Sequence, residues 1–318
     1  MKKALITGIN GFIGSHLADY LLKKDYKVFG TIRKTSNTEK IEHIKDKIKL
    51  KEVELTDAKS VYEVLNDTKP SEIYHLASYS NVKKSWEEPR EVILSNSIGT
   101  INLFEAVRKL NINPSIQIAG SSEEYGLSLK DGSSVKETAP LKPLSPYAVS
   151  KVFQDMLSFQ YSKTYGVKSI VTRGFNHTGP RRDGTYVVSS FSKQIVMIEK
   201  GLQEPVMTVG NLEVQRDFSD VRDVVRAYHL LLQKIIPGES YNICSGKAYS
   251  IKEILDMLLS LSNAKIKIKS NPKKMRSNDT LIMNGSYEKL HKQTGWKPEI
   301  PFEKTLRDLL DYWREKIK

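Results

Sequence analysis

The stretch Thr7-Gly8-Ile9-Asn10-Gly11-Phe12-Ile13-Gly14 decides the fold of this chain. It follows a short apolar run, Lys3-Ala4-Leu5-Ile6, that predicts a buried strand, and it leads into helical apolar spacing from Phe12 to Lys24. Glycines between a strand and a helix let the backbone turn sharply and approach a pyrophosphate, and the first N–H groups of the helix favour an anion. A purely structural glycine turn is the alternative. The stretch predicts a dinucleotide site that includes Gly8, Asn10, Gly11, Phe12, Ile13 and Gly14.

Strand and helix patterns alternate from this stretch up to Phe175. Such alternation implies parallel strands joined by crossover helices, and therefore an α/β fold with a doubly wound parallel (Rossmann) sheet. Beyond Phe175 the pattern is irregular, which predicts a smaller mixed α/β C-terminal domain for the substrate. We expect the Rossmann domain to cover residues 1–175, with 218–244 returning to it, and the substrate domain to cover 176–217 and 245–318.

Composition indicates a globular chain of 318 residues, 39% hydrophobic and 27% charged. One cysteine excludes an internal disulfide and a cysteine-built zinc site, and the six histidines show no ligand spacing, so we expect no metal. No apolar run approaches the roughly 18 residues that span a bilayer, and no signal peptide is evident, which predicts a cytoplasmic protein without a membrane partner.

The charge is strongly basic, with 50 Lys and Arg against 37 Asp and Glu, for a net charge of +13. The lysines are scattered among glutamates and form no basic arm. This distribution fits a solvated surface, or attraction of anionic sugar phosphates, better than a nucleic-acid interface, so we expect no nucleic-acid partner.

The end of the second predicted strand bears on the choice of dinucleotide. An acidic residue there would bind the ribose hydroxyls of NAD. This chain has Arg33 and Lys34, followed by Thr35 and Ser36. Two cations beside two hydroxyls favour the 2′-phosphate of NADP over NAD. The alternative is a surface loop that carries two cations.

A second motif is Tyr147-Ala148-Val149-Ser150-Lys151. Residues four apart share one face of a helix, so the ammonium of Lys151 would lie beside the phenol of Tyr147. A neighbouring cation lowers the pKa of a phenol from about 10 and makes it a usable general acid or base. Chance produces this spacing often, so it gains weight only together with the other motifs.

A third motif, Gly120-Ser121-Ser122-Glu123-Glu124-Tyr125-Gly126, ends a predicted buried strand. In open parallel sheets that end faces the ligand crevice. We expect Ser121 to hydrogen-bond a substrate oxygen and Glu123 to supply a reactive carboxylate. Glu124 fits an ordinary polar loop.

Together these motifs resemble the extended short-chain dehydrogenase/reductases that act on sugar nucleotides. The resemblance covers nearly the whole chain and is strongest to the GDP-mannose branch, which comprises GDP-mannose 4,6-dehydratases and reductases of GDP-4-keto-6-deoxy-mannose. The segments that carry it are Ile32-Arg33-Lys34-Thr35-Ser36, Phe175-Asn176-His177, Pro180-Arg181-Arg182 and Gly210-Asn211-Leu212.

The resemblance implies roles for many residues. The catalytic group would be Ser121, Glu123, Tyr147 and Lys151. Cofactor contacts would be the glycine-rich stretch, Arg33, Lys34, Glu54, Leu55, Leu76, Ala77, Ser78, Ser80, Tyr147, Lys151, His177 and Arg182. Substrate contacts would be Ser122, Glu123, Asn176, Val187, Lys193, Arg216, Arg276 and Asp279, with Lys193, Arg216 and Arg276 at the diphosphate.

The branch leaves two reactions open. A dehydratase would use Tyr147 to take the sugar O4 proton and Glu123 to take the C5 proton as water leaves C6. A reductase would need only Tyr147 as an acid at a 4-ketone. Because Glu123 has a role only in the first reaction, we expect a GDP-mannose 4,6-dehydratase. The alternatives are the 4-keto reductase and another sugar-nucleotide epimerase or reductase.

The family also implies a homo-oligomer, a dimer or a tetramer. The predicted helices near 97–110 and 146–165 carry more apolar residues than one buried stripe requires. We expect the surplus to meet a second copy across a two-fold axis. The residues concerned are Phe104, Val107, Phe153, Met156, Leu157 and Phe159.

Overall fold

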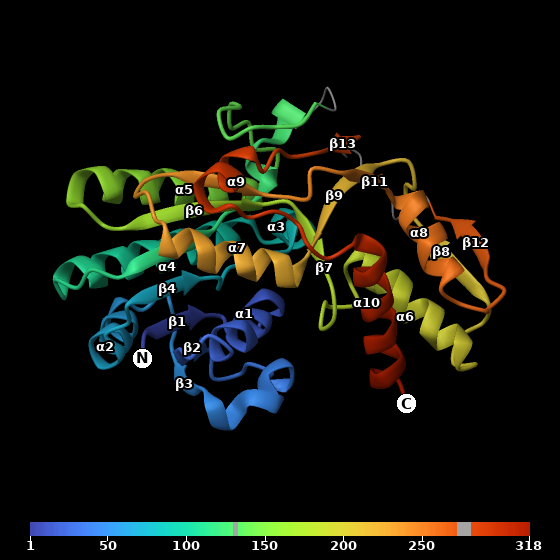
Figure 1. Ribbon diagram of the computed structural model, residues 1–318, viewed down its shortest axis with the longest axis horizontal. Helices are drawn as coiled ribbons and strands as arrows, with labels where there is room; N and C mark the ends of the chain where they lie inside the picture. The colour runs from blue at the N-terminus through green and yellow to red at the C-terminus, as the bar shows by residue number, and fades with distance from the viewer. Residues whose placement is uncertain (130–132, 272–280) are drawn as a thin grey trace.

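The computed structural model describes residues 1–129, 133–271 and 281–318. Its main sheet has seven strands in the order β10-β6-β5-β4-β1-β2-β3, and every neighbouring pair is parallel (Figure 1). The order reverses direction after β1, so the doubly wound Rossmann sheet is confirmed. The strands are β1 (Lys3–Thr7), β2 (Lys27–Ile32), β3 (Lys49–Glu52), β4 (Glu72–His75), β5 (Ser115–Ala119), β6 (Ser169–Gly174) and β10 (Ser240–Ile243).

Two helical layers cover this sheet, each through its own apolar core. One core joins the sheet to α1, α7 and α9, with Leu17, Tyr228 and Leu290 among its members. The other joins the opposite face to α2, α4 and α5. The helices are α1 (Phe12–Leu22), α2 (Ala58–Thr68), α3 (Val82–Glu87), α4 (Pro89–Lys109), α5 (Pro146–Tyr165), α7 (Val221–Gln233) and α9 (Glu288–Thr294), with the short turns η1 (Glu39–Lys47), η2 (Ser122–Glu124) and η3 (Gly126–Leu129).

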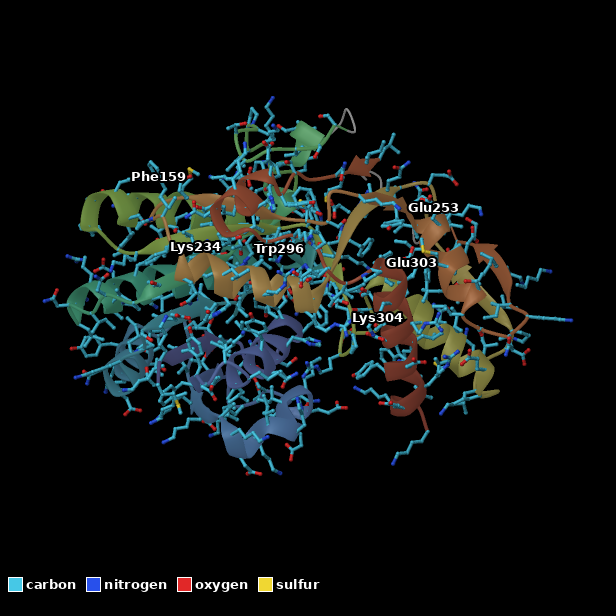
Figure 2. All side chains as sticks on the ribbon, in the orientation of Figure 1. Phe159, Lys234, Glu253, Trp296, Glu303 and Lys304 are labelled. Carbon is cyan, nitrogen blue, oxygen red and sulfur yellow. The ribbon has the colours of Figure 1, made fainter. Side chains whose placement is uncertain are left out.

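A smaller mixed part lies at the right of Figure 1. Strand β9 pairs antiparallel with β11 and parallel with β13 and β7, and β8 pairs with β12. A third core joins its helices, and Glu253, labelled in Figure 2, completes a capping box with Ser250 at the start of α8. The elements are β7 (Asn176–Thr178), α6 (Val187–Glu199), β8 (Val206–Val209), β9 (Gln215–Asp220), β11 (Ala248–Ser250), α8 (Ile251–Ser260), β12 (Lys267–Ser270), β13 (Ile282–Met283) and α10 (Phe302–Lys316).

Part of the surface expected for self-association is not surface at all. Phe104 and Val107 are buried in the core between α4 and the sheet, because α4 packs against both α2 and α5, and Leu157 packs on the same core. The expectation was wrong for Phe104 and Val107, whereas Leu157 is only partly buried. Phe153, Met156 and Phe159 on α5 are 37%, 48% and 49% exposed. They leave an exposed apolar face on this helix, so self-association through it stays a prediction. Among the residues described, no helix is both long and apolar enough to cross a membrane.

Candidate active site

The predicted site residues gather where strands of the main sheet end. Gly8 follows β1, Leu76 follows β4 and Ser121 follows β5, and these three strands are neighbours through β4. Asn176 begins β7 directly after β6, which pairs with β5. The carboxyl ends of parallel strands meet at one edge, so sequence segments more than a hundred residues apart converge there.

The glycine-rich turn forms a narrow cradle at this edge. Gly8 has a φ of +69°, which favours glycine, and its N–H donates to Thr31 O at 3.2 Å. A Cβ on Gly14 would lie 2.4 Å from Gly8 O, so no side chain fits there. Gly11 stands at the N-cap of α1, where it leaves the first N–H groups of the helix uncovered by a side chain of its own. The cradle fits a dinucleotide pyrophosphate.

The side chains predicted to lie near the adenine and its ribose differ in exposure. Arg33 and Lys34 are exposed after β2, and Asn10 Nδ2 donates to Asn37 O at 2.9 Å, which ties the cradle to the loop that carries these cations. Glu54 accepts hydrogen bonds from Thr56 and is exposed. Leu55 packs toward Gly99, where an added Cβ would lie 3.2 Å from it.

Tyr147 is buried near the start of α5, and its hydroxyl shares a hydrogen bond with Ser121. Helix α5 begins here because Ser145 caps it, its Oγ accepting the Ala148 N–H at 3.1 Å, with Pro146 following. Ser121 in turn caps η2 and accepts the Glu123 N–H at 3.2 Å. The serine, the tyrosine and the turn that carries Glu123 are therefore one constellation.

The pKa of Tyr147 differs from the expectation. Burial raises it above the ordinary value for a phenol, and the hydrogen bond with Ser121 offsets this only in part. The Lys151 ammonium does lie over the Tyr147 ring, 5.7 Å from its centre, but the effect of burial on the pKa is the largest one. The prediction of a lowered phenol pKa was wrong for this structure.

Among the described residues, the ammonium of Lys151 has three acceptors. It donates to Ala119 O at 2.7 Å, to Gln154 Oε1 at 2.9 Å and to Ser78 Oγ at 3.1 Å. Burial lowers the pKa of Lys151 to about 8. The side chain is thus fixed between β4, β5 and α5, within the edge that the cradle also occupies.

Arg182 lies across two aromatic rings. Its guanidinium carbon is 3.4 Å from the centre of the Tyr186 ring and 4.8 Å from that of Phe12. His177 stacks on Phe12 with ring centres 6.0 Å apart, and burial lowers the pKa of His177 to about 4. Within the described part of the chain, Arg182 Nε and Asn176 Nδ2 are buried donors without an acceptor. Such donors fit a ligand rich in oxygen.

The remaining predicted residues are less concentrated. Ser122 is buried and donates to Met283 Sδ at 3.3 Å, and the Leu76 and Ala77 N–H groups both donate to Thr7 Oγ1. Arg216 donates to its neighbour's carbonyl on β9. Of the others, Ser80, Val187 and Lys193 are exposed, with Lys193 Nζ 5.5 Å from the Trp313 ring, and Arg276 and Asp279 lie outside the described residues.

Sequence reasoning missed three contributors to the site. His75 contacts Thr7 Oγ1 at 3.0 Å through Nδ1 and Thr100 on α4 through Nε2, and Gln154 contacts Lys151. Glu124, which a polar loop would leave in water, is fully buried behind Ser121. All three residues stand next to a strand end or a motif in the sequence, which is a signal for a role in the site. Their partners come from distant parts of the chain, so the sequence pattern does not reveal the contacts.

Comparison with known proteins agrees with this geometry. Residues 5–309 match the family described as GDP-mannose 4,6 dehydratase. The chain is 31% identical to the GDP-6-deoxy-D-mannose reductase of Pseudomonas aeruginosa, covering 100% of this chain and 99% of the relative. It is 34% identical to GDP-mannose 4,6 dehydratase 1 of Arabidopsis thaliana, with 98% of this chain and 89% of the relative covered.

A solved structure of RMD from Pseudomonas aeruginosa complexed with NADPH matches with a TM-score of 0.87 at 29% identity, covering 100% of both chains. Other matching structures were solved with NAD, so a nicotinamide dinucleotide is the cofactor type that these neighbours share. The relatives are sugar-nucleotide dehydratases and reductases. The chain therefore belongs to the GDP-mannose 4,6-dehydratase family within the extended short-chain dehydrogenase/reductases, as its motifs predicted.

Proposed function

We propose that this chain converts GDP-mannose to GDP-4-keto-6-deoxy-mannose and water, with NADP as its cofactor. The observation that carries the proposal is the place of Glu123. It is half-buried on the turn capped by Ser121, and its charge acts on Tyr147. A carboxylate at this point can take a carbon-bound proton, which dehydration requires and ketone reduction does not.

The chain's own residues divide the proton transfers between them. Tyr147 accepts the proton of the sugar O4, Ser121 orients that oxygen, and Lys151 provides the buried cation beside them. Bound NADP would supply the hydride acceptor for C4 and the hydride donor for C6. Glu123 takes the C5 proton, made acidic by the 4-ketone, and donates a proton to the departing C6 hydroxyl. The proton that Tyr147 took from O4 would pass to C5 as the hydride is donated to C6, so one water leaves and both the side chains and the cofactor end as they began.

NADP is proposed on the strength of the loop after β2. Arg33 and Lys34 are exposed there, so both cations are available to a 2′-phosphate. The nucleotide end of the substrate is proposed to lie in the smaller part of the chain. A hollow of about 410 Å³ is lined there by Val209, Gly210, Asn211, Leu212, Glu213, Ile268 and Ser270.

Reduction of a 4-keto sugar is the second candidate, and one observation favours it. A ketone oxygen needs only a proton donor, and a phenol with the ordinary pKa of about 10 is protonated at neutral pH. The reductase relative at 31% identity is consistent with this alternative.

One experiment separates the two reactions. The purified chain is incubated with GDP-mannose and no added reductant, and the sugar nucleotide is weighed by mass spectrometry. Loss of one water supports the dehydratase. No change with GDP-mannose, together with NADPH-dependent turnover of GDP-4-keto-6-deoxy-mannose, supports the reductase. Failure with both substrates would contradict the proposed function.

A further inference from the structure

A carboxylic acid lies directly behind the catalytic turn. Glu124 is fully buried, and its Oε1 accepts the Ser121 N–H at 2.7 Å. Gly120 makes room for it, since a Cβ on Gly120 would lie 2.7 Å from Glu124 Oε1. The hydrogen bond completes a reciprocal cap with the Ser121 side chain, so Glu124 holds the residue that contacts Tyr147.

Glu124 shares its buried space with a second carboxyl and one guanidinium. Its Oε2 lies 3.6 Å from Arg173 Nε. Arg173 forms an ion pair with Asp155, in which Arg173 Nε lies 2.8 Å from Asp155 Oδ2. Ser240 Oγ donates to the other Asp155 oxygen at 2.9 Å. Arg173 Nη1 donates to Tyr125 and to the Glu137 carbonyl. One cation therefore faces two carboxyl groups.

Charge balance decides which carboxyl is neutral. Two carboxylates around one guanidinium would leave a net negative charge in a buried site, which is strongly unfavourable. Asp155 is paired with Arg173 and accepts from Ser240, whereas Glu124 Oε2 accepts no hydrogen bond among the described residues. Burial, and then the charge of Asp155, raise the pKa of Glu124 well above its usual value. Glu124 is the group that holds the proton.

We infer that Glu124 is a positioning residue that acts as a neutral carboxylic acid, fixing the Ser121 backbone and with it the turn that presents Ser121 and Glu123 to Tyr147. The inference rests on the proposed function for the identity of the catalytic groups. The neutrality of Glu124 matters to Lys151, because the negative charge of an ionised Glu124 would raise the pKa of Lys151. Among the described residues, the other charged or titratable groups that interact with Glu124 are Asp155, Arg173, Tyr125 and Tyr147.

A comparison of two variants of Glu124 tests this inference. Glu124→Gln keeps an oxygen for the Ser121 N–H and mimics the neutral acid, so its pH–rate profile should superimpose on that of the unmodified enzyme. Glu124→Leu removes the acceptor, so kcat should fall by about 10- to 100-fold as the turn loses its register. Glu204→Gln, at an exposed position, is the matched control. An alkaline limb displaced by Glu124→Gln would show that Glu124 is ionised and would overturn the inference.

Two readouts do not depend on turnover. Infrared difference spectra should contain the carbonyl band of a protonated carboxylic acid that Glu124→Gln removes and Glu204→Gln keeps. Amide hydrogen exchange of the Ser121 N–H should accelerate in Glu124→Leu and stay unchanged in Glu124→Gln. Absence of the band, or equal exchange in all variants, would contradict the inference. If the chain acted on neither sugar nucleotide, the proposed function would fail while these two readouts still decided the state of Glu124.

Discussion

The ammonium of Lys151 lies 2.9 Å from the side-chain oxygen of Gln154, one turn further along α5. Gln154 passes the contact on, because its amide donates to Thr100 Oγ1 at 2.6 Å. Thr100 in turn contacts His75 Nε2 at 3.2 Å, and His75 Nδ1 contacts Thr7 Oγ1 at 3.0 Å. A buried chain of side chains thus connects the lysine to the strand that ends in the glycine cradle.

These hydrogen-bonded side chains predict that Gln154 helps to position the Lys151 ammonium. Gln154→Leu removes one acceptor and leaves two, so we expect the fold to survive and kcat to fall by about 10- to 150-fold, in line with loss of a single charge-assisted hydrogen bond. The acidity of Lys151 should also shift in the kcat pH profile, which a general loss of stability would not produce. Gln293→Leu, remote on α9, is the control. Unchanged kinetics in Gln154→Leu would contradict the role.

The loop after β2 predicts the cofactor preference. Arg33→Ala should weaken NADP by about 1.5–3 kcal/mol and leave NAD nearly unchanged, because only NADP carries the phosphate that the guanidinium would contact. Isothermal titration with both dinucleotides measures the difference. Lys47→Ala, another exposed cation on η1, should change neither affinity. Equal binding of NAD and NADP by the unmodified chain would mean that Arg33 and Lys34 are only surface residues.

The sequence predicted those features that depend on local pattern. Helix α5 begins at Pro146 and ends before Gly166, whose φ of +68° suits glycine, so its bounds were readable from cap residues. Strands β7 and β13 are too short for a periodicity, and they exist because β9 pairs with them. They were not predicted, and neither were the surroundings of the site. The burial of Glu124 depends on Arg173, and the pKa of Tyr147 depends on packing, which spacing along a helix does not determine.

A pH dependence follows from His16, which ties α1 to the loop after β7. Its Nδ1 accepts from Arg181 Nη2 at 2.7 Å, so its Nε2 carries the hydrogen and donates to Pro180 O at 2.8 Å. Burial, and then the charge of Arg181, lower the pKa of His16 to about 4. A folded-state pKa below the unfolded value of about 6.5 means that the unfolded chain binds the proton first, so stability is lost as pH falls between these values.

We therefore expect the free energy of unfolding of His16→Gln to fall less steeply as the pH is lowered from 6.5 to 4. Gln can accept from Arg181 and donate to Pro180 without titrating. Urea unfolding between pH 6.5 and pH 4 should show a slope smaller by up to about 1.4 kcal/mol per pH unit than in the unmodified chain, the contribution of one proton. The histidines at positions 75 and 177 have lowered pKa values for the same reason of burial and remain in both proteins. Parallel curves would contradict the assigned state of His16.

The exposed face of α5 predicts self-association. Val149, Phe153, Met156 and Phe159 are all exposed and follow one another at helical spacing, and Phe159 is labelled on α5 in Figure 2. A contiguous apolar stripe of this kind fits a second copy of the same helix. Met156→Glu should shift the molar mass in light scattering toward the monomer, whereas Tyr62→Glu on α2 should not. A monomeric unmodified chain at working concentrations would contradict the prediction.

Glu123 provides the sharpest prediction, because the two candidate reactions use it differently. Elimination requires a carboxylate that takes the C5 proton, and Glu123→Gln keeps the size and one acceptor oxygen while it removes that basicity. In a dehydratase the variant should still oxidise C4, so the absorbance of reduced cofactor should accumulate on the protein and no dehydrated product should form. In a reductase the proton comes from Tyr147, so the same variant should keep most of its turnover.

Tyr147→Phe is the matched control for this experiment. It removes the hydroxyl that shares a hydrogen bond with Ser121, so turnover should fall by about 100-fold or more and no reduced cofactor should accumulate. If Glu123 only stabilises the turn, a third outcome is expected: Glu123→Gln lowers the melting temperature and slows every step equally. A thermal melt recorded beside the cofactor absorbance distinguishes the three. We expect trapped reduced cofactor at an unchanged melting temperature, because Glu123 is half-buried on a turn that Ser121 and Glu124 already hold.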